Sequence, residues 1–220
     1  MFRVYVFLIL IFTGFFSFSQ GNKNLYKQYR TGPDPDSFYH LWNYSFYGRV
    51  NWINSDQDYT KPSIGKGIGF AIQKLNSKTF GWSTGIEFNQ IRYQYDGLLN
   101  NSSDNTNWLS FPLTIRLYPS RKLFFEIGFK YHYFLTAKNS ITNNPITGTL
   151  KYPNESFGNT FGTLITIQYQ VWKRLNIGLQ YQYMKSNKIN TVSIQPSVFD
   201  GLSLKLGTFI KNPLKRPESN

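Results

Sequence analysis

Apolar and polar side chains alternate along most of the chain between residues 41 and 211. In the clearest segment, the apolar positions Leu109, Phe111, Leu113, Ile115 and Leu117 are interleaved with Ser110, Pro112, Thr114 and Arg116. A period of two predicts a β-strand with two unlike faces. Aromatic residues are frequent on the apolar face, whereas glycines, glutamines and charged residues occupy the polar face. The pattern is typical of a transmembrane β-barrel, which is apolar outside and polar inside.

Eight such segments are separated by connections that alternate in length. The predicted strands cover residues 41–53, 64–75, 79–95, 109–117, 125–133, 159–172, 175–186 and 201–211. Tight turns are predicted at 76–78, 119–122 and 173–174, and long loops at 54–63, 96–107, 137–158 and 187–200. This alternation indicates periplasmic turns and outer loops. We therefore expect an all-β fold, an eight-stranded antiparallel up-and-down transmembrane β-barrel over residues 41–211.

The two ends of the chain differ from the barrel segments. Arg3 precedes an almost wholly apolar run over 4–16, and Ser17 and Ser19 supply the small residues of a cleavage site. This favours a signal peptide over 1–19; a retained membrane helix is the alternative, but the run is short for a span of about 20 residues. Residues 20–40 are predicted to be a periplasmic lead-in and 212–220 a periplasmic tail. The chain has no cysteine, so neither a lipid anchor nor a disulfide is expected.

Composition and charge placement agree with export to the outer membrane of a Gram-negative cell envelope. Aromatic residues make up 19% of the chain and the formal net charge is +13. The basic residues are dispersed and the chain is exported, so nucleic acid is not an expected partner. Outer-membrane lipid or lipopolysaccharide suits this charge better. Lys66, Lys74 and Arg92, which point outward, lie near strand ends, where their side chains can reach headgroups.

The remaining strand charges are predicted to face the barrel interior. A soluble sandwich or a lipocalin-like calyx would not require this sorting, whereas a charge facing lipid at mid-depth costs roughly 2–4 kcal/mol. Because eight strands enclose little space, we expect a packed polar network rather than an open channel. Its predicted members are Arg49, Glu87, Arg116, Glu126, Lys130, His132 and Lys205.

Three features of this interior invite chemical hypotheses. Arg116 and Glu126 face each other across the 119–122 turn, which predicts an ion pair that is either a proton site or, as we favour, a structural bridge. His132 and Ser110 both point inward on neighbouring strands at unknown relative heights, so catalysis on lipid is disfavoured. Glycines at alternate positions of 65–69 leave room for bulky inward residues such as Tyr47 and do not form a phosphate loop. No catalytic, cofactor or metal site is expected.

Two segments of the chain resemble a known family. Residues 108–119 read WLSFPLTIRLYP and residues 122–135 read KLFFEIGFKYHYFL. Together they resemble the central hairpin of the PorT-like small outer-membrane β-barrels of Bacteroidota, and FGWSTGIEF at 80–88 is similar to that family's third strand. The resemblance implies an outer-membrane protein and says little about activity. The chain departs from a common barrel ending, because it runs on through 212–220 instead of stopping at an aromatic residue.

These observations predict a barrel without enzyme activity. We expect a membrane-anchored structural or binding module, or an accessory subunit of an envelope complex, that contacts other envelope proteins through its outer loops. The longest predicted loop, 137–158, is the expected contact surface. Two alternatives remain open: a hydrolase acting on lipid A or lipopolysaccharide acyl chains, and a narrow pore.

Overall fold

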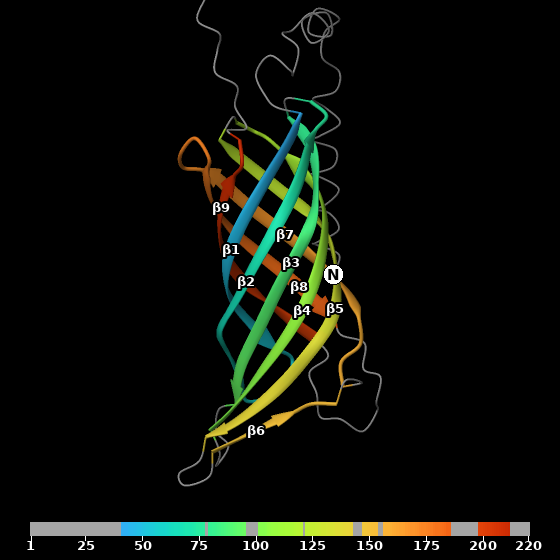
Figure 1. Ribbon diagram of the computed structural model, residues 1–220, viewed down its shortest axis with the longest axis vertical. Helices are drawn as coiled ribbons and strands as arrows, with labels where there is room; N and C mark the ends of the chain where they lie inside the picture. Colours follow the sequence, from blue (N-terminus) through green and yellow to red (C-terminus); the bar gives the residue numbers. More distant parts are fainter. Residues whose placement is uncertain are drawn as a thin grey trace, which may run out of the picture. The chain divides into compact units, whose positions relative to one another are not determined.

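The computed structural model describes residues 41–77, 79–95, 101–120, 122–142, 147–153, 156–185 and 198–211. Eight antiparallel strands close into a barrel (Figure 1). They are β1 (Trp42–Ser55), β2 (Thr60–Leu75), β3 (Phe80–Tyr95), β4 (Asn101–Leu117), β5 (Leu123–Thr142), β7 (Thr160–Gln170), β8 (Leu175–Lys185) and β9 (Val198–Phe209). Pairing of β9 with β1 completes the circle, which confirms the predicted fold class.

Some of the sequence predictions concern other parts of the chain. The predicted signal peptide at 1–19, the lead-in at 20–40 and the tail at 212–220 lie outside the described residues. Within the described residues, no helix has the length and hydropathy needed to cross a membrane.

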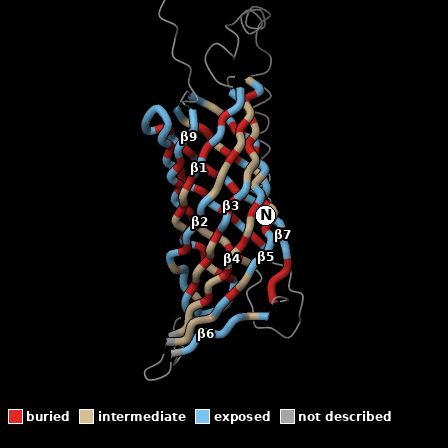
Figure 2. The backbone as a smooth tube through the Cα atoms, in the orientation of Figure 1, coloured by how far each residue is buried: buried red, intermediate tan, exposed pale blue. Residues whose placement is uncertain are grey.

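Burial alternates along the strands in the inverse sense to a soluble protein. In β7 and β8 every second residue is exposed, and the exposed ones are mostly large and apolar: Phe161 is 69% exposed and Ile165 52%. The buried partners are polar, such as Thr166, Gln168 and Gln182. Buried and exposed residues therefore follow each other around the whole wall (Figure 2). This is the arrangement of a barrel that is surrounded by hydrocarbon.

The barrel wall has longer strands on one side than on the other. Strands β3, β4 and β5 have 16, 17 and 20 residues, whereas β7, β8 and β9 have 11, 11 and 12. The extra length projects at the end opposite the tight turns. There β6 (Thr147–Lys151) pairs with the last residues of β5 and adds one more strand (Figure 1). We call this projection, residues 91–95, 101–107, 136–142 and 147–151, the extended rim.

The extended rim corrects the predicted loops. Residues 101–107 and 137–142 are strand, and 147–151 forms β6, although 96–107 and 137–158 were expected to be loops. Alternation continues there, but both faces are polar: Asp104 and Thr106 are buried while Asn105 and Asn107 are not. Hydropathy therefore gives no sign of these strand ends. The predicted loop 54–63 is also wrong, because β1 reaches Ser55 and β2 starts at Thr60.

Glycines in β2 make room for large interior side chains. A Cβ on Gly69 would lie 2.5 Å from Cζ of Tyr47, and one on Gly67 would lie 2.8 Å from Cγ of Arg49. Both are direct register neighbours, since Tyr47 pairs with Gly69 and Arg49 with Gly67. The predicted role of these glycines is thus confirmed, and it lets Tyr47 and Arg49 cross the lumen toward β3.

Candidate functional site

One half of the interior network is built around Glu87 on β3. Its Oε1 lies 2.9 Å from Nη1 of Arg49 and 3.0 Å from Nζ of Lys130, and its Oε2 accepts a hydrogen bond of 3.0 Å from the hydroxyl of Tyr47. All four side chains are buried. A buried carboxylate is stable only when partners of this kind satisfy it. The cluster ties β1, β3 and β5 together across the lumen.

The other half is built around the predicted pair of Arg116 and Glu126. These residues are direct register partners on β4 and β5, and Nε of Arg116 forms an ion pair with Oε1 of Glu126. Gln168 donates a hydrogen bond of 2.6 Å to the second carboxylate oxygen. The guanidinium also donates to Gln73 and lies 4.3 Å from the ring centroid of Phe124. Every oxygen of Glu126 is therefore paired, which suits a structural bridge.

The network carries more positive than negative charge. Arg49, Arg116, Lys130 and Lys205 are all buried together with Glu87 and Glu126. Part of the excess is met by neutral groups. The Nζ of Lys205 lies 3.8 Å from the ring centroid of Tyr47, and Oε1 of Gln182 accepts a hydrogen bond of 3.0 Å from Arg49. An aromatic face and an amide oxygen both attract cations without adding charge.

Ser110 and His132 form a pair inside the barrel. The sequence left their relative heights open, and the structure places Ser110 Oγ 2.8 Å from Nδ1 of His132. Their exposed fractions are 0% and 1%, and the ring of Trp108 packs edge-on against the imidazole. Among the described residues, no carboxylate accepts a hydrogen bond from His132. The pair faces away from the hydrocarbon, so an acyl chain outside the wall does not reach it.

An aromatic cap closes the lumen next to the extended rim. We use this name for the buried cluster Ile53, Ile91, Tyr93, Trp108, Phe134, Ala137, Phe157, Met184 and Phe199. Trp108 is at its centre and contacts Phe134, Phe157 and Phe199 at ring-centroid distances of 5.1–6.4 Å. The cap places an apolar layer above the ionic network. Water and ions are disfavoured in such a layer, so it seals this end of the barrel.

A buried carboxylate fastens the extended rim, and sequence reasoning missed it. Asp104 accepts hydrogen bonds from the hydroxyls of Tyr95 at 2.8 Å and Tyr152 at 3.0 Å, and from Nδ2 of Asn139 at 2.6 Å. Burial, and then the charge of Asp104, raise the pKa of Tyr152 above its ordinary value. We call these four residues the Asp104 latch. No hydropathy signal could have revealed it, because residues 101–107 are all polar.

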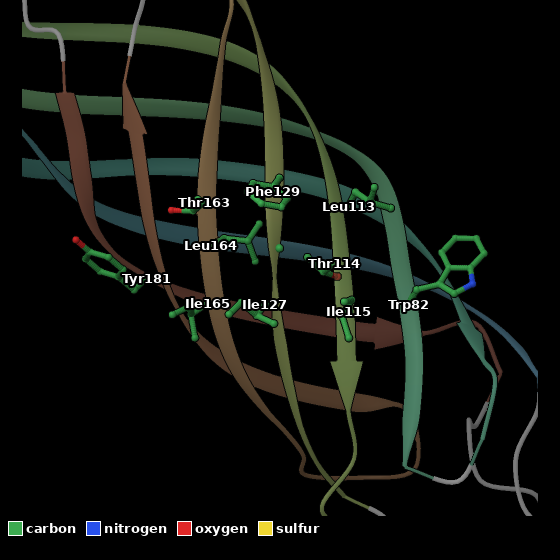
Figure 3. Close-up of a pocket in the computed structure, with 11 residues that line it drawn as sticks. Trp82, Leu113, Thr114, Ile115, Ile127, Phe129, Thr163, Leu164, Ile165 and Tyr181 are labelled. Atoms are coloured by element: carbon green, nitrogen blue, oxygen red, sulfur yellow. The ribbon is translucent and has the colours of Figure 1, made fainter. Parts of the chain in front are cut away.

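The lipid-facing wall contains one hollow among the described residues that bears on the enzyme alternative. It has a volume of about 610 Å³ and lies over β3, β4, β5, β7 and β8 (Figure 3). Its lining is mostly apolar and includes Leu113, Ile115, Ile127, Phe129 and Ile165. The lining contains neither serine nor histidine. An acyl chain that enters this hollow meets no catalytic pair.

Of the three predicted outward charges, Lys74 lies at the end of β2 and Arg92 in the extended rim. Lys66 instead lies near the middle of β2 between exposed Ile64 and Ile68, because that strand starts at Thr60 and not at residue 64. Lys66 is exposed, and Lys74 and Arg92 are partly exposed. The Nζ of Lys74 lies 5.3 Å from the ring centroid of Trp42. Within the described residues, no group of three histidine, cysteine, aspartate or glutamate side chains is arranged to hold a metal ion.

Comparison with known proteins finds only distant structural similarity. No protein-family model and no curated protein sequence matches the chain. Among solved structures, the attachment invasion locus protein Ail of Yersinia pestis is similar, with a TM-score of 0.46, 10% identity and coverage of 76% of this chain and 96% of Ail. The outer membrane protein OprG of Pseudomonas aeruginosa has a TM-score of 0.45 and 12% identity, covering 80% of this chain and 99% of OprG. Nothing in these matches tests the PorT-like resemblance, which stays a prediction.

The barrel itself determines where the protein resides. A closed eight-stranded wall exposes large apolar side chains all around, while charged groups are enclosed. Every backbone group of a closed barrel finds a partner in the wall, which is what a lipid environment requires. The protein is an outer-membrane β-barrel protein.

Proposed function

We propose that the protein is a membrane-anchored binding module that contacts other envelope components through its extended rim, without catalysis. One observation carries the proposal: the only large departure from a minimal barrel among the described residues is the projecting sheet of β3, β4, β5 and β6. The Asp104 latch and the aromatic cap stabilise this sheet from its inner side. A rigid surface beyond the membrane is suited to recognition.

The packed interior supports this function over a pore. Both ionic clusters span the lumen, and the aromatic cap lies above them. A conducting path would need a continuous file of water past Trp108 and Arg116, which are 0% and 1% exposed. We expect wild-type protein in planar bilayers to show no ion conductance. Stable channel openings would favour the pore instead.

The enclosed Ser110–His132 pair supports the module over a hydrolase. Both residues point into the lumen, and the outer hollow is lined by neither serine nor histidine. The protein is therefore proposed to belong to the cell envelope as an anchor or accessory subunit, in keeping with the PorT-like resemblance.

Purification from native outer membranes in mild detergent tests the proposal. We expect a stoichiometric companion protein that is lost when Gln94, Ser103 and Thr149, on the outer row of the extended rim, are all replaced by glutamate. These positions lie in one row, since Gln94 pairs with Ser103, Ser103 with Ser140, and Ser140 with Thr149. The matched control replaces Ser77, Thr79 and Ser120, at the tight turns, by glutamate as well. Recovery of the wild-type barrel without any companion contradicts the accessory-subunit form.

A further inference from the structure

Three cations and an amide form a row across the outward face of the extended rim. Arg92 on β3 pairs with Asn105 on β4, Asn105 with Lys138 on β5, and Lys138 with Lys151 on β6. We call these four residues the cationic row. Adjacent strands are about 4.8 Å apart, so the row extends over roughly 14 Å.

The side chains of the row point away from the lumen. Their sequence neighbours Ile91, Tyr93, Asp104, Thr106 and Ala137 are buried. Lys138 and Lys151 are exposed, and Arg92 and Asn105 are partly exposed. The row is therefore on the face that continues the lipid-contacting wall beyond its apolar part.

The row has no counter-charge of its own. Within the described residues, no carboxylate forms an ion pair with Arg92, Lys138 or Lys151, and Nε of Arg92 is shielded from solvent without an acceptor. Lys138 and Lys151 are direct cross-strand partners, an arrangement in which like charges repel. An anion between them removes that repulsion. The row is thus arranged to receive external negative charge.

The height of the row matches the headgroup region of the adjacent leaflet. The last large apolar outward residues before it are Phe88 on β3 and Leu135 on β5, which are 41% and 39% exposed. A strand rises about 3.3 Å per residue, so Arg92 lies roughly 13 Å along β3 from Phe88 and Lys138 roughly 10 Å along β5 from Leu135. The tilt of barrel strands, about 35–45°, reduces this height. Long cationic side chains reach back from such positions to the headgroups.

We propose that the cationic row binds the phosphate groups of a membrane-embedded glycolipid, lipopolysaccharide, in the outer leaflet. The inference rests on the proposed function, in which the extended rim lies on the external side of the outer membrane. Arg92 supplies a planar fork of donors for phosphate oxygens, the two lysines supply point charges, and Asn105 supplies an amide donor between them. A diphosphorylated headgroup uses more of the row than a single phosphate does.

Binding to lipid A in nanodiscs tests the site directly. Wild-type barrel is titrated with diphosphorylated lipid A and with its dephosphorylated form, both in a phosphatidylcholine background. We expect the triple variant R92Q/K138Q/K151Q to bind the diphosphorylated form about tenfold more weakly or worse, because three charge-assisted contacts are lost. The matched control K122Q/K173Q/R174Q removes the same charge at the tight turns and leaves binding unchanged. Equal affinity of wild type and the triple variant overturns the site.

Further readouts separate lipid binding by the row from misfolding and from general attraction to polyanions. The variant K138R/K151R keeps the positive charges, so it is expected to bind diphosphorylated lipid A as wild type does if the row acts through charge. Heat-dependent gel migration shows whether each variant forms a barrel. If the sulfated polysaccharide heparin binds wild type as well as lipid A does, and needs the same three residues, the row recognises polyanions and the lipid assignment is wrong. If wild-type protein does not bind diphosphorylated lipid A but is still recovered with a companion protein, this inference alone is overturned, because the companion test concerns the outer row.

Discussion

At the level of single residues, each charged group that is buried in the interior depends on neighbouring groups for its charge compensation and hydrogen bonds. Glu87 has two cationic neighbours and a tyrosine hydroxyl, and Glu126 has a guanidinium and an amide. Removing one partner from a buried pair leaves the other charge without compensation, which costs more than the pair contributes. Single substitutions in the network are therefore expected to destabilise the barrel, whereas replacement of both members of a pair is expected to be tolerated.

The Arg116–Glu126 bridge offers the clearest residue-level prediction. We expect Glu126→Leu to lower the free energy of unfolding by about 3–5 kcal/mol, because Arg116 remains buried without its counter-charge. The double variant Arg116→Met and Glu126→Leu removes both charges and is expected to recover much of that loss. Urea unfolding in lipid vesicles measures both. Equal losses in the single and the double variant would show that the two residues are not coupled.

Among the structural elements, strand length distinguishes this barrel. Strands β3, β4 and β5 continue past the apolar wall, and the Asp104 latch joins them to the segment after β6: Tyr152 donates its hydroxyl to Asp104, and its backbone N–H donates to the carbonyl of Ala137 at 3.0 Å. The latch uses only uncharged donors around one carboxylate. It therefore stabilises the rim without neutralising Asp104.

The latch predicts a local effect of Tyr152→Phe. Loss of the hydroxyl removes the hydrogen bond that it donates to the Asp104 carboxylate, worth about 1 kcal/mol. We expect faster amide hydrogen exchange over 137–142, with little change in the lower barrel. Tyr133→Phe, an exposed tyrosine on the lipid-facing side, is the matched control. Unchanged exchange in the Tyr152 variant would mean that packing alone holds the rim.

The pH dependence of the rim is a second readout of the same latch. The folded pKa of Tyr152 is raised above the ordinary value of 10.0. The unfolded rim therefore ionises first as pH rises, so the contribution of Tyr152 is full below pH 10 and decreases above it. A phenolate absorbance titration should show one fewer late-ionising tyrosine in Tyr152→Phe than in wild type, where the pKa of Tyr95 in the same latch is also raised.

The barrel as a whole is organised by its surroundings. Most of the side chains that face outward over the wall are large and apolar, with exceptions such as Lys66 and Thr163, whereas the outward side chains of the extended rim are mostly polar. The wall thus lies within the hydrocarbon of the membrane, and the extended rim lies beyond the hydrocarbon. The proposed functions of both the outer row and the cationic row depend on this boundary.

A charge-placement experiment locates the boundary. Ile127 is 53% exposed in the middle of the wall, whereas Thr136 is on the same strand at the extended rim. We expect Ile127→Arg to destabilise the inserted barrel by about 2–4 kcal/mol, because the charge faces lipid at mid-depth. Thr136→Arg should be tolerated. The fraction of heat-modifiable protein in purified outer membranes measures both, and equal tolerance would place the boundary elsewhere.

Features that depend on local period could be predicted from the amino-acid sequence. The alternation of apolar and polar residues with a period of two assigned the inward and outward faces. The turn at 119–122 predicted that Arg116 lies opposite Glu126, which is only ten residues away along the chain. Chain neighbours in an up-and-down barrel are also neighbours in space, so a hairpin can be predicted without knowing how the barrel closes. The interior members were predictable for the same reason.

Contacts across the lumen, in contrast, could be read only from the closed barrel. Tyr47 and Lys130 reach Glu87 from 40 and 43 residues away, each across an intervening strand. Such contacts depend on the stagger with which eight strands close, which no local pattern encodes. The parts of the extended rim at 101–107, 137–142 and 147–151 were equally hidden, because a strand that is largely polar on both faces has no hydropathy period; backbone pairing with neighbouring strands makes these segments strands.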